Sequence, residues 1–348
     1  MMKRSTLIFF LIFLLAIGFT LNAYAEIKPI RWIVQSCFPL ETPASKYGIS
    51  MWANKVEAMS GGRLIIRLHA AGEIVPATGV FEAVRDGVLD AGLNTPAFQR
   101  GLYPAGDLFY TLPAGITKFE DLIVWMYGGE GLKLNQDMYG DKIIVFVLGL
   151  TPPEEIWSKK PINSLDDLRG LKIRTAGLGM NLFEALGSSV VMIPGSEVVP
   201  ALQRGVIDAA EVSDPAGDYG LGLADVSDYL VGPPIHMGPN IYQLVINPKS
   251  WEELPGDLQE IVKNAATAAT LEGYGLYWME VVHNFQKIMD SGVTITRFSP
   301  EAQAKARELT FEILDRKSKE DPYFGKVWDS QKNFLENFKP YYNFTSFD

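Results

Sequence analysis

The sequence is poor in cysteine and histidine, and it has no excess of basic residues. Its 348 residues include one cysteine and three histidines. A single cysteine cannot form an intramolecular disulfide or a thiolate cluster for zinc or iron–sulfur. His69, His236 and His283 lack the short spacing of a histidine metal site. The 41 Asp and Glu residues outnumber 31 Lys and Arg, and a net charge of −10 argues against a nucleic-acid partner, which needs a basic face.

Several catalytic and phosphate-binding motifs are also missing. The sequence contains no Gly-x-Ser-x-Gly, P-loop or His-Glu-x-x-His motif. Gly177 and Gly179 follow an expected strand, but no dinucleotide fingerprint is completed after them, so we predict a turn there. These absences disfavour the common nucleophilic, nucleotide-dependent and zinc-dependent enzymes.

One apolar run of note lies at the N-terminus, and it predicts an exported protein. Lys3 and Arg4 precede the apolar stretch Leu7–Phe19, and Ala23-Tyr24-Ala25 ends the segment. This is the layout of a secretory signal peptide, here residues 1–25, cut near Ala25. The alternative is a membrane anchor, but the run is shorter than the ~20 residues that a span needs. Cleavage takes the net charge from −10 to −12. Export without disulfides favours a bacterial periplasm.

The rest of the chain alternates short strands with helices. Hydrophobic residues make up 47% of the sequence, which is ample for packed cores, and the length allows two or three domains. The alternation predicts an α/β fold with largely parallel sheets. We expect strands at Ile30–Gln35, Leu64–Leu68, Val88–Leu93, Ile143–Gly149 and Leu171–Thr175, and helices at Ala44–Met59 and Phe81–Arg85.

Long helices are expected after Ser250. Their predicted ranges are Leu258–Asp290, Pro300–Ser318 and Gly325–Phe338. Ser250, with Glu253 three residues later, predicts a capping box for the first turn of this region.

An internal repeat predicts two related lobes. Residues 81–92 (FEAVRDGVLDAG) reappear as residues 199–210 (VPALQRGVIDAA). Each copy reads as the end of a helix, a Gly suited to a left-handed C-cap, and a buried strand opening with an Asp. Two such lobes define a cleft, because open α/β sheets bind ligands beyond the carboxyl ends of their strands.

Charged residues near two strand ends are the candidate ligand-binding groups. Arg174 ends the strand after Ser164–Gly170, which reads as a short capped helix and a turn. A guanidinium there could grip a carboxylate through two parallel hydrogen bonds, although a surface ion pair is the plainer alternative. Glu211 and Asp214 follow the second copy of the repeat and could hold a cation or a donor group, or be ordinary loop charges.

Aromatic residues could form the wall of such a cleft. The candidates are Phe98, Tyr103, Trp157 and Tyr242, although a lone aromatic residue is more often part of a core.

Together, these segments resemble a known family. Ser164–Arg174, Pro200–Asp208, Glu211 and the sequence WEELP at 251–255 are similar to the extracytoplasmic solute-binding subunits of TRAP transporters, the DctP-type family. The resemblance covers essentially the whole mature chain. It implies a two-lobed periplasmic binding protein with a ligand cleft between the lobes, long C-terminal helices, and Arg174 as the carboxylate clamp.

The resemblance also suggests where the lobes begin and end. Residues 26–150 would form the first lobe, completed by about 236–265. Residues 151–235 would form the second, completed by part of 266–320. Residues 321–348 would be a C-terminal helix and tail that could swap between two copies of the chain.

A subgroup of the family is indicated by the segment after Glu211. The length of EVSDP at 211–215 and the sequence GPNIYQ at 238–243 are similar to the subgroup that binds 2-oxoacids and lactate. Relatives in that subgroup bridge the acid to the protein through a metal ion. The resemblance therefore implies a calcium or sodium site at Glu211, Val212 and Gln243, and a ligand site at Arg174, Asn94, Phe98, Trp157, Glu211, Asp214 and Tyr242.

Two departures from the subgroup stand out. Val212 replaces its usual Trp, which predicts room for a larger side chain on the ligand, and Pro153-Glu154-Glu155 replaces a Gln that precedes Trp157.

The predicted function is periplasmic capture of a small monocarboxylate, a 2-oxo or 2-hydroxy acid, by lobe closure, and its delivery to a membrane permease. No catalytic residue and no obligatory cofactor are predicted. The alternatives are a binding protein for another importer or a sensor, and an exported enzyme using Glu211 and Asp214 as an acid–base pair.

Overall fold

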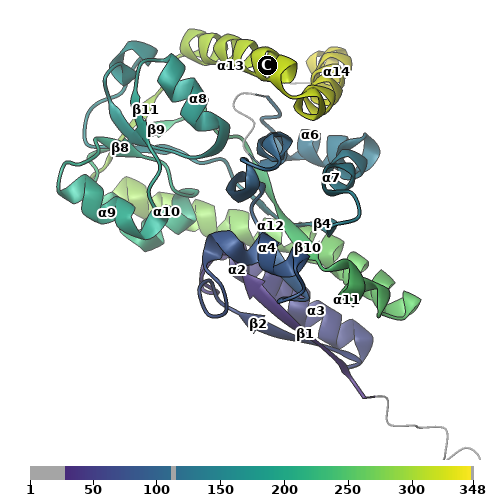
Figure 1. The fold of residues 1–348 in the computed structure, drawn as a ribbon. Helices are drawn as coiled ribbons and strands as arrows, with labels where there is room; N and C mark the ends of the chain where they lie inside the picture. The colour runs from purple at the N-terminus through teal and green to yellow at the C-terminus, as the bar shows by residue number, and fades with distance from the viewer. Residues whose placement is uncertain (1–27, 111–114, 346–348) are drawn as a thin grey trace, which may run out of the picture.

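Two β-sheets, each covered by helices, form the two lobes of the computed structural model, which describes residues 28–110 and 115–345 (Figure 1). The predicted signal peptide lies outside the described residues. The α/β class and the two-lobed architecture are as predicted.

The first lobe is built on a five-stranded mixed sheet. β1 pairs in parallel with both β2 and β3, and β10 lies antiparallel between β3 and β4. In spatial order the strands are β2 (Leu64–His69), β1 (Ile30–Ser36), β3 (Ala91–Asn94), β10 (Asn240–Ile246) and β4 (Ile144–Thr151).

The second lobe repeats this arrangement with one strand added. β6 pairs in parallel with β7 and β8, and β5 lies antiparallel between β8 and β9. In spatial order the strands are β7 (Ser189–Val191), β6 (Lys172–Arg174), β8 (Ala209–Ala210), β5 (Ile156–Ser158), β9 (Tyr229–Gly232) and β11 (Thr294–Arg297).

The internal repeat is confirmed by matching contacts in the two lobes. Gly87 and Gly205 both adopt positive φ, 77° and 67°, at the turn after a helix. The carboxylate of Asp90 then accepts a hydrogen bond from the backbone N–H of Ile33 in β1. Asp208 does the same for Lys172 in β6. Each Asp therefore ties the start of one strand to its parallel neighbour.

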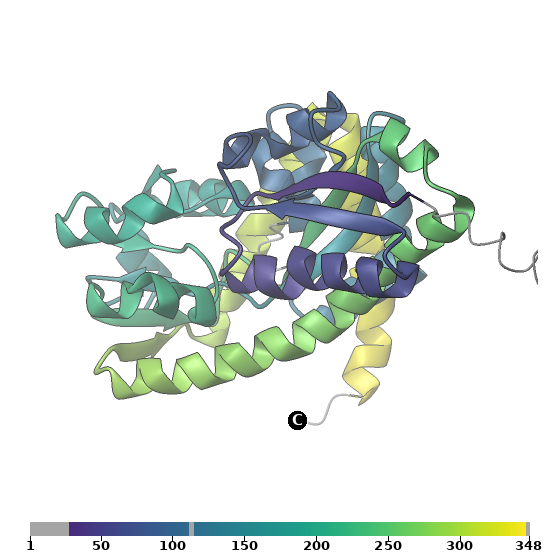
Figure 2. The ribbon, with the colours of Figure 1, turned by 90° about the horizontal axis from the view of Figure 1, so that it is seen from below.

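One strand of each sheet arrives from the other lobe. The chain leaves the first lobe after β4 and enters the second at β5, and it returns from β9 to β10. The two crossing segments are residues 152–155 and 233–239. The helix α12 (Gly256–Asp290) is the third connection, since it packs on α3 and β4 of the first lobe and on α10 of the second (Figure 2).

Helices cover the sheets, and the C-terminal pair packs across the lobes. α13 lies against α8 of the second lobe, whereas α14 lies against α5 and α7 of the first. The helices are α2 (Pro43–Ser45), α3 (Met51–Ser60), α4 (Val80–Arg85), α5 (Asp107–Tyr110), α6 (Phe119–Ile123), α7 (Gly131–Tyr139), α8 (Gly177–Ala185), α9 (Gly195–Gln203), α10 (Pro215–Leu221), α11 (Pro248–Glu252), α12, α13 (Pro300–Glu320) and α14 (Pro322–Thr345).

The long C-terminal helices are confirmed, but two local predictions are wrong. The N-cap before α11 is Asn247, whose Oδ1 accepts from the backbone N–H groups of Lys249 and Ser250. The Ser250 hydroxyl donates instead to Asp90. Gly177 opens α8 rather than forming a turn, because Leu178 and Leu182 of that helix are buried.

None of the described helices, α12 included, combines the length and apolar character needed to cross a membrane.

Close packing of α12 on the first lobe depends on Gly273. A β-carbon at this position would lie 2.1 Å from the backbone oxygen of Tyr47, in the short π-helical segment Lys46–Ser50. We predict that Gly273→Ala destabilises the protein by about 1–3 kcal/mol. Gly275, two residues along, has open space around it, so Gly275→Ala should stabilise the helix by up to about 1 kcal/mol. Urea unfolding of both variants measures the contrast, and equal midpoints would contradict it.

Candidate functional site

Buried polar groups gather where the chain crosses between the lobes. Residues 152–155 carry Glu154 and Glu155, and residues 233–239 carry His236. Both crossings begin with a Pro-Pro pair. Glu211, which follows β8, is influenced electrostatically by Glu154 and by His236. The two crossings and a strand end of the second lobe therefore meet at one place.

Arg174 is held at the end of β6 by the protein itself. The side chain is 8% exposed. Its Nε donates to the carbonyl of Ile193 at 3.1 Å, and its Nη1 donates to the carbonyl of Glu211. Nη1 also lies 3.6 Å from Oε2 of Glu211. No group in the described part of the chain hydrogen-bonds to Nη2, so one edge of a fixed, buried guanidinium remains for a ligand.

Glu211 is a fully buried carboxylate that keeps its charge. Its Oε1 accepts from the backbone N–H of Ala176 at 2.7 Å. Burial acts to raise the pKa of Glu211, but the charge of Arg174 and the neighbouring carboxyl group of Glu154 outweigh it and hold the pKa below its usual value. Its Oε2 receives no hydrogen bond within the described ranges.

Glu154, on the first crossing, faces Glu211. It is 3% exposed, and burial together with the charge of Glu211 raises its pKa well above the ordinary value. Two buried carboxyl groups this close cannot both ionise cheaply, so Glu154 holds the proton when no cation is present. Nδ2 of Asn240 donates to Glu154 Oε1 at 3.5 Å, whereas Oδ1 of Asn240 has no donor among the described residues.

His236 is buried and neutral. Burial lowers its pKa to about 4, with the charge of Glu211 opposing the shift. Its ring lies 5.2 Å from that of Phe183, and neither ring nitrogen has a hydrogen-bond partner in the described ranges. Buried polar atoms without partners are uncommon in proteins and indicate a missing ligand or water.

Two tyrosines complete the cluster from the first lobe. Tyr110 and Tyr242 are in ring contact at 6.1 Å. Burial raises the pKa of each well above 10. Both hydroxyls therefore stay protonated and can donate to an anion.

Asp214, a predicted ligand residue, caps a helix in this structure. It accepts hydrogen bonds from the backbone N–H of Ala216 at 2.9 Å, from the Ser213 hydroxyl and from the hydroxyl of Tyr277. Since Tyr277 lies on α12, Asp214 joins the second lobe to that helix.

Trp157 is fully buried in the core of the second lobe. Its indole N–H donates to Asp218 at 2.7 Å, and its ring packs with Val198 and Leu230. Trp157 therefore supports the site as part of the hydrophobic core.

The predicted metal residue Gln243 lies in another hydrogen-bond network. Its Oε1 accepts from the hydroxyl of Tyr139 at 2.9 Å, and its Nε2 donates to Asn135 at 2.7 Å. Asn94 donates to the same Oε1 at 3.4 Å. The cause is strand geometry, because successive side chains of β10 point to opposite faces of the sheet and only Tyr242 faces the cluster.

Two further predicted residues lie apart from the cluster. Phe98 and Tyr103 pack against the first-lobe cluster around Phe81 and Tyr139. Val212 is a different case, because it directly follows Glu211 in the chain while its side chain packs on the second-lobe core. A β-carbon on Gly195 would lie 3.2 Å from it.

The structure thus brings together Arg174, Glu211 and Tyr242 from the predicted set. The prediction missed Tyr110, Glu154, His236 and Asn240. The Pro-Pro pair before both Glu154 and His236 is the sequence signal that could have drawn attention to the two crossings.

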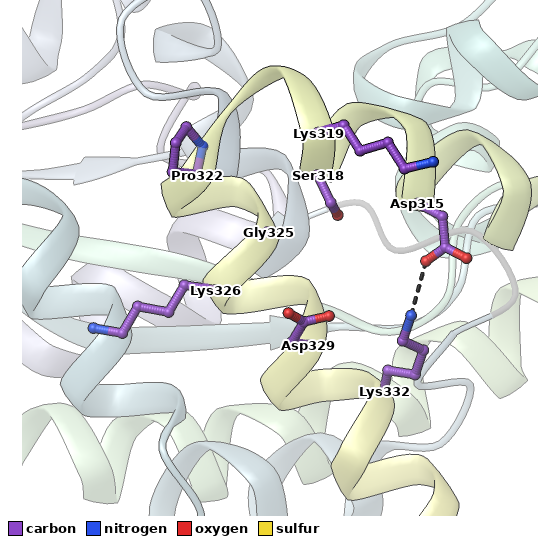
Figure 3. A pocket seen from close by; sticks show the side chains of 8 residues that line it. All are labelled: Asp315, Ser318, Lys319, Pro322, Gly325, Lys326, Asp329 and Lys332. Carbon is purple, nitrogen blue, oxygen red and sulfur yellow. Dashed lines mark hydrogen bonds and ion pairs between the residues drawn. The ribbon is translucent and has the colours of Figure 1, made fainter.

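A surface hollow lies away from this cluster. It measures about 680 Å³ between α13 and α14, and Asp315 and Lys332 form an ion pair of 2.9 Å at its edge (Figure 3). Its lining comes from the two helices and carries charges of both signs without a buried polar side chain, so the crossing cluster is the stronger candidate site.

Oxygen atoms without donors make a cation possible at the cluster. In the described part of the chain, no three His, Cys, Asp or Glu side chains are arranged to hold a metal ion. Oε2 of Glu211 and Oδ1 of Asn240, however, are buried acceptors without donors, and oxygen acceptors are what calcium and sodium ions require. The residues fit a cation only if a ligand supplies further oxygen atoms.

Comparison with known proteins identifies relatives over the full length of the fold. A monocarboxylate 2-oxoacid-binding periplasmic protein of Nostoc sp. is 31% identical over 318 residues, which are 90% of this chain and 86% of the relative. A TRAP periplasmic solute-binding protein of Pseudoalteromonas atlantica, solved with sodium and pyruvate, has a TM-score of 0.85 and 27% identity and covers 92% of this chain and 100% of its own. That of Colwellia psychrerythraea, solved with calcium and pyruvate, has a TM-score of 0.86 and 26% identity, and covers 91% and 98%.

The family model gives the same result. The model of the bacterial extracellular solute-binding proteins, family 7 (DctP), matches residues 38–321. That family is periplasmic and its members bind solutes. The chain therefore belongs to the DctP family of TRAP solute-binding proteins.

Proposed function

We propose that this protein captures a small monocarboxylate, a 2-oxo or 2-hydroxy acid, between its lobes and delivers it to a TRAP membrane permease. The observation that carries the proposal is Arg174, a buried guanidinium fixed by two backbone carbonyls with Nη2 left over. Tyr110 and Tyr242 add protonated hydroxyls beside it. The names of the relatives support the same class of ligand.

A calcium or sodium ion would be bound with the acid. Four carboxyl groups near the cluster are buried, Glu154, Glu211, Asp214 and Asp218, whereas Arg174 is the one buried cation of the described chain. A bound cation offsets this excess of negative charge, which otherwise has to be neutralised by protons. Glu154, Glu211 and Asn240 are the residues placed to hold it, in place of the predicted Val212 and Gln243. The ion supplies a positive charge that draws the acid's oxygens to the site.

The remaining expectations are also proposals. The mature chain would begin near Glu26, after removal of residues 1–25. The exported-enzyme alternative is disfavoured because Asp214, one half of its acid–base pair, is occupied by a helix cap and by Tyr277. A homodimer through the C-terminal helix is supported by Tyr341 and Phe344 of α14, which are 63% and 85% exposed. Val212 still predicts that acids with side chains longer than that of pyruvate bind.

Removal of the guanidinium should abolish binding. We predict that Arg174→Ala weakens pyruvate binding at least about 100-fold, since an anion in a closed cleft would lose its charged partner. Arg174→Lys should restore only part of the affinity, because an ammonium cannot bond through two parallel edges. Isothermal titration with pyruvate, calcium and sodium measures both. Arg169→Ala, which removes a guanidinium from the surface just before β6, is the control and should bind normally. Wild-type affinity in Arg174→Ala would refute the proposal.

The cation should be selected by the charge at Glu154. We predict that Glu154→Gln removes most of the stabilisation that calcium confers in the presence of pyruvate, while the effect of sodium changes little. The reason is that a neutral amide matches a monovalent ion beside Glu211 better than a divalent one. Thermal shifts with each ion measure this. Glu155→Gln, one residue along the same crossing, is the matched control. An unchanged calcium shift in Glu154→Gln would exclude Glu154 from the cation site.

Stability without a cation should fall as the pH rises above neutrality. Burial, reinforced by the charge of Asp214, raises the pKa of Glu155 to about 8, so the folded chain holds a proton that the unfolded chain has lost above about pH 4.5. His236, with its lowered pKa, gives the opposite slope, but only below its unfolded value near 6.5. We therefore predict a loss on the order of 1 kcal/mol between pH 6.5 and 8.5 in EDTA, measured by urea unfolding. Glu155→Gln should flatten this slope, and an identical slope in that variant would contradict the assignment.

A further inference from the structure

Arg100 joins the two lobes beside the candidate site. It follows the 3₁₀ turn Pro96–Gln99 of the first lobe. Its Nη1 donates to the carbonyl of Gly177 at 3.2 Å, and its Nη2 donates to Oδ1 of Asn181 at 3.5 Å. Both acceptors belong to α8 of the second lobe. The Arg100 side chain is 31% exposed, which places this contact at the edge of the interface between the lobes.

The residues that accept hydrogen bonds from Arg100 follow closely in the chain after the proposed ligand clamp, Arg174. Arg174 ends β6, the N–H of Ala176 binds Glu211, and the carbonyl of Gly177 receives Arg100. Leu178, the next residue, is buried in the first-lobe cluster that includes Leu108. The first turn of α8 therefore contacts the first lobe directly, three to four residues from the clamp.

Arg100 itself is held by the helix of the first lobe that also carries the site residue Tyr110. Arg100 Nη2 lies 3.3 Å from the carboxylate of Asp107, which is 2% exposed and stands in the first turn of α5. Tyr110 is the last residue of the same short helix and lies beside Glu154 and Glu211. Asp107 thus anchors the guanidinium on the element that also carries a site tyrosine.

We propose that Arg100 is a positioning residue that fastens α8 to the first lobe when the cleft is closed, and so slows the release of the bound acid. The proposal rests on ligand capture by lobe closure. A contact that exists only in the closed state stabilises that state by its full interaction free energy. The closed population therefore rises, although Arg100 never touches the ligand.

The direct test is the rate of ligand release. Stopped-flow tryptophan fluorescence measures the dissociation of pyruvate from wild type, Arg100→Ala and Arg100→Lys, with calcium and sodium present. We expect the dissociation rate to rise about tenfold in Arg100→Ala and less in Arg100→Lys, with the association rate within twofold of wild type. Loss of the ion pair with buried Asp107 should lower the unfolding midpoint of Arg100→Ala whether or not pyruvate is present, so the dissociation rate is the decisive readout. A merely structural role would leave that rate unchanged.

Two controls isolate the contact. Arg85→Ala removes a guanidinium of the first lobe that pairs with its neighbour Asp86, and it should leave release unchanged. Asn181→Ala should reproduce part of the effect, and adding it to Arg100→Ala should cause little further change, because the two residues form one interaction. Full additivity of the two substitutions would overturn the proposal.

A second measurement judges the proposal even if pyruvate is the wrong ligand. Fluorophores on Glu57→Cys in the first lobe and Arg204→Cys in the second report the separation of the lobes by energy transfer. The native Cys37 is buried, and burial raises the pKa of its thiol, so it is not labelled. Arg100→Ala should lower the closed fraction with and without pyruvate. An unchanged closed fraction refutes the role of Arg100, whereas failure of pyruvate to bind wild type refutes the proposed function alone.

Discussion

Each sheet of this protein contains a strand that the chain brings from the other lobe, and this exchange determines where a ligand can bind. β10 lies between β3 and β4, and β5 lies between β8 and β9. The chain must therefore cross the cleft twice, and the crossings carry Glu154 and His236 into the interior. Ligand binding at such crossings would depend on the relative position of the lobes, because the segments that join the lobes also carry residues of the proposed site.

An acidic protein that binds anions relies on local charge rather than on net charge. The overall charge of −10 acts at long range and is screened by salt. In the function that we propose, the ligand instead meets Arg174, held in place by two carbonyl groups, and the protonated Tyr110 and Tyr242. The buried carboxyl groups that surround them make the cluster receptive to a cation as well as to an acid. The proposed site can therefore bind an anion together with its counter-ion.

The sequence predicts the architecture better than it predicts the site. The repeat of residues 81–92 at 199–210 could be detected because it reflects local backbone requirements. These are a Gly in the left-handed conformation and an Asp that hydrogen-bonds to a neighbouring strand. Arg174 and Glu211 could be found because they lie at strand ends, Arg174 as the last residue of β6 and Glu211 directly after β8. Gln243 shows the limit of a resemblance, which gives a residue type but not the face of the strand on which the side chain lies.

The partners that the sequence did not reveal depend on contacts between distant segments. Glu154 and Asn240 are 86 residues apart, and they meet only because both crossings run through the same cleft. Trp157 and Asp214 have the residue types of a binding site, yet each is occupied by a structural partner, Asp218 and Tyr277. No local pattern distinguishes a polar group that is already satisfied from one that awaits a ligand.

The shared strands also have a consequence for how the protein comes apart. Neither lobe is a separable piece of chain, because removing one from the other would withdraw an interior strand, β5 or β10, from its sheet. The α12 helix is 35 residues long, packs on both lobes and forms a third connection between them. The two halves should therefore melt as one cooperative unit, even though the proposed function requires them to move as two bodies.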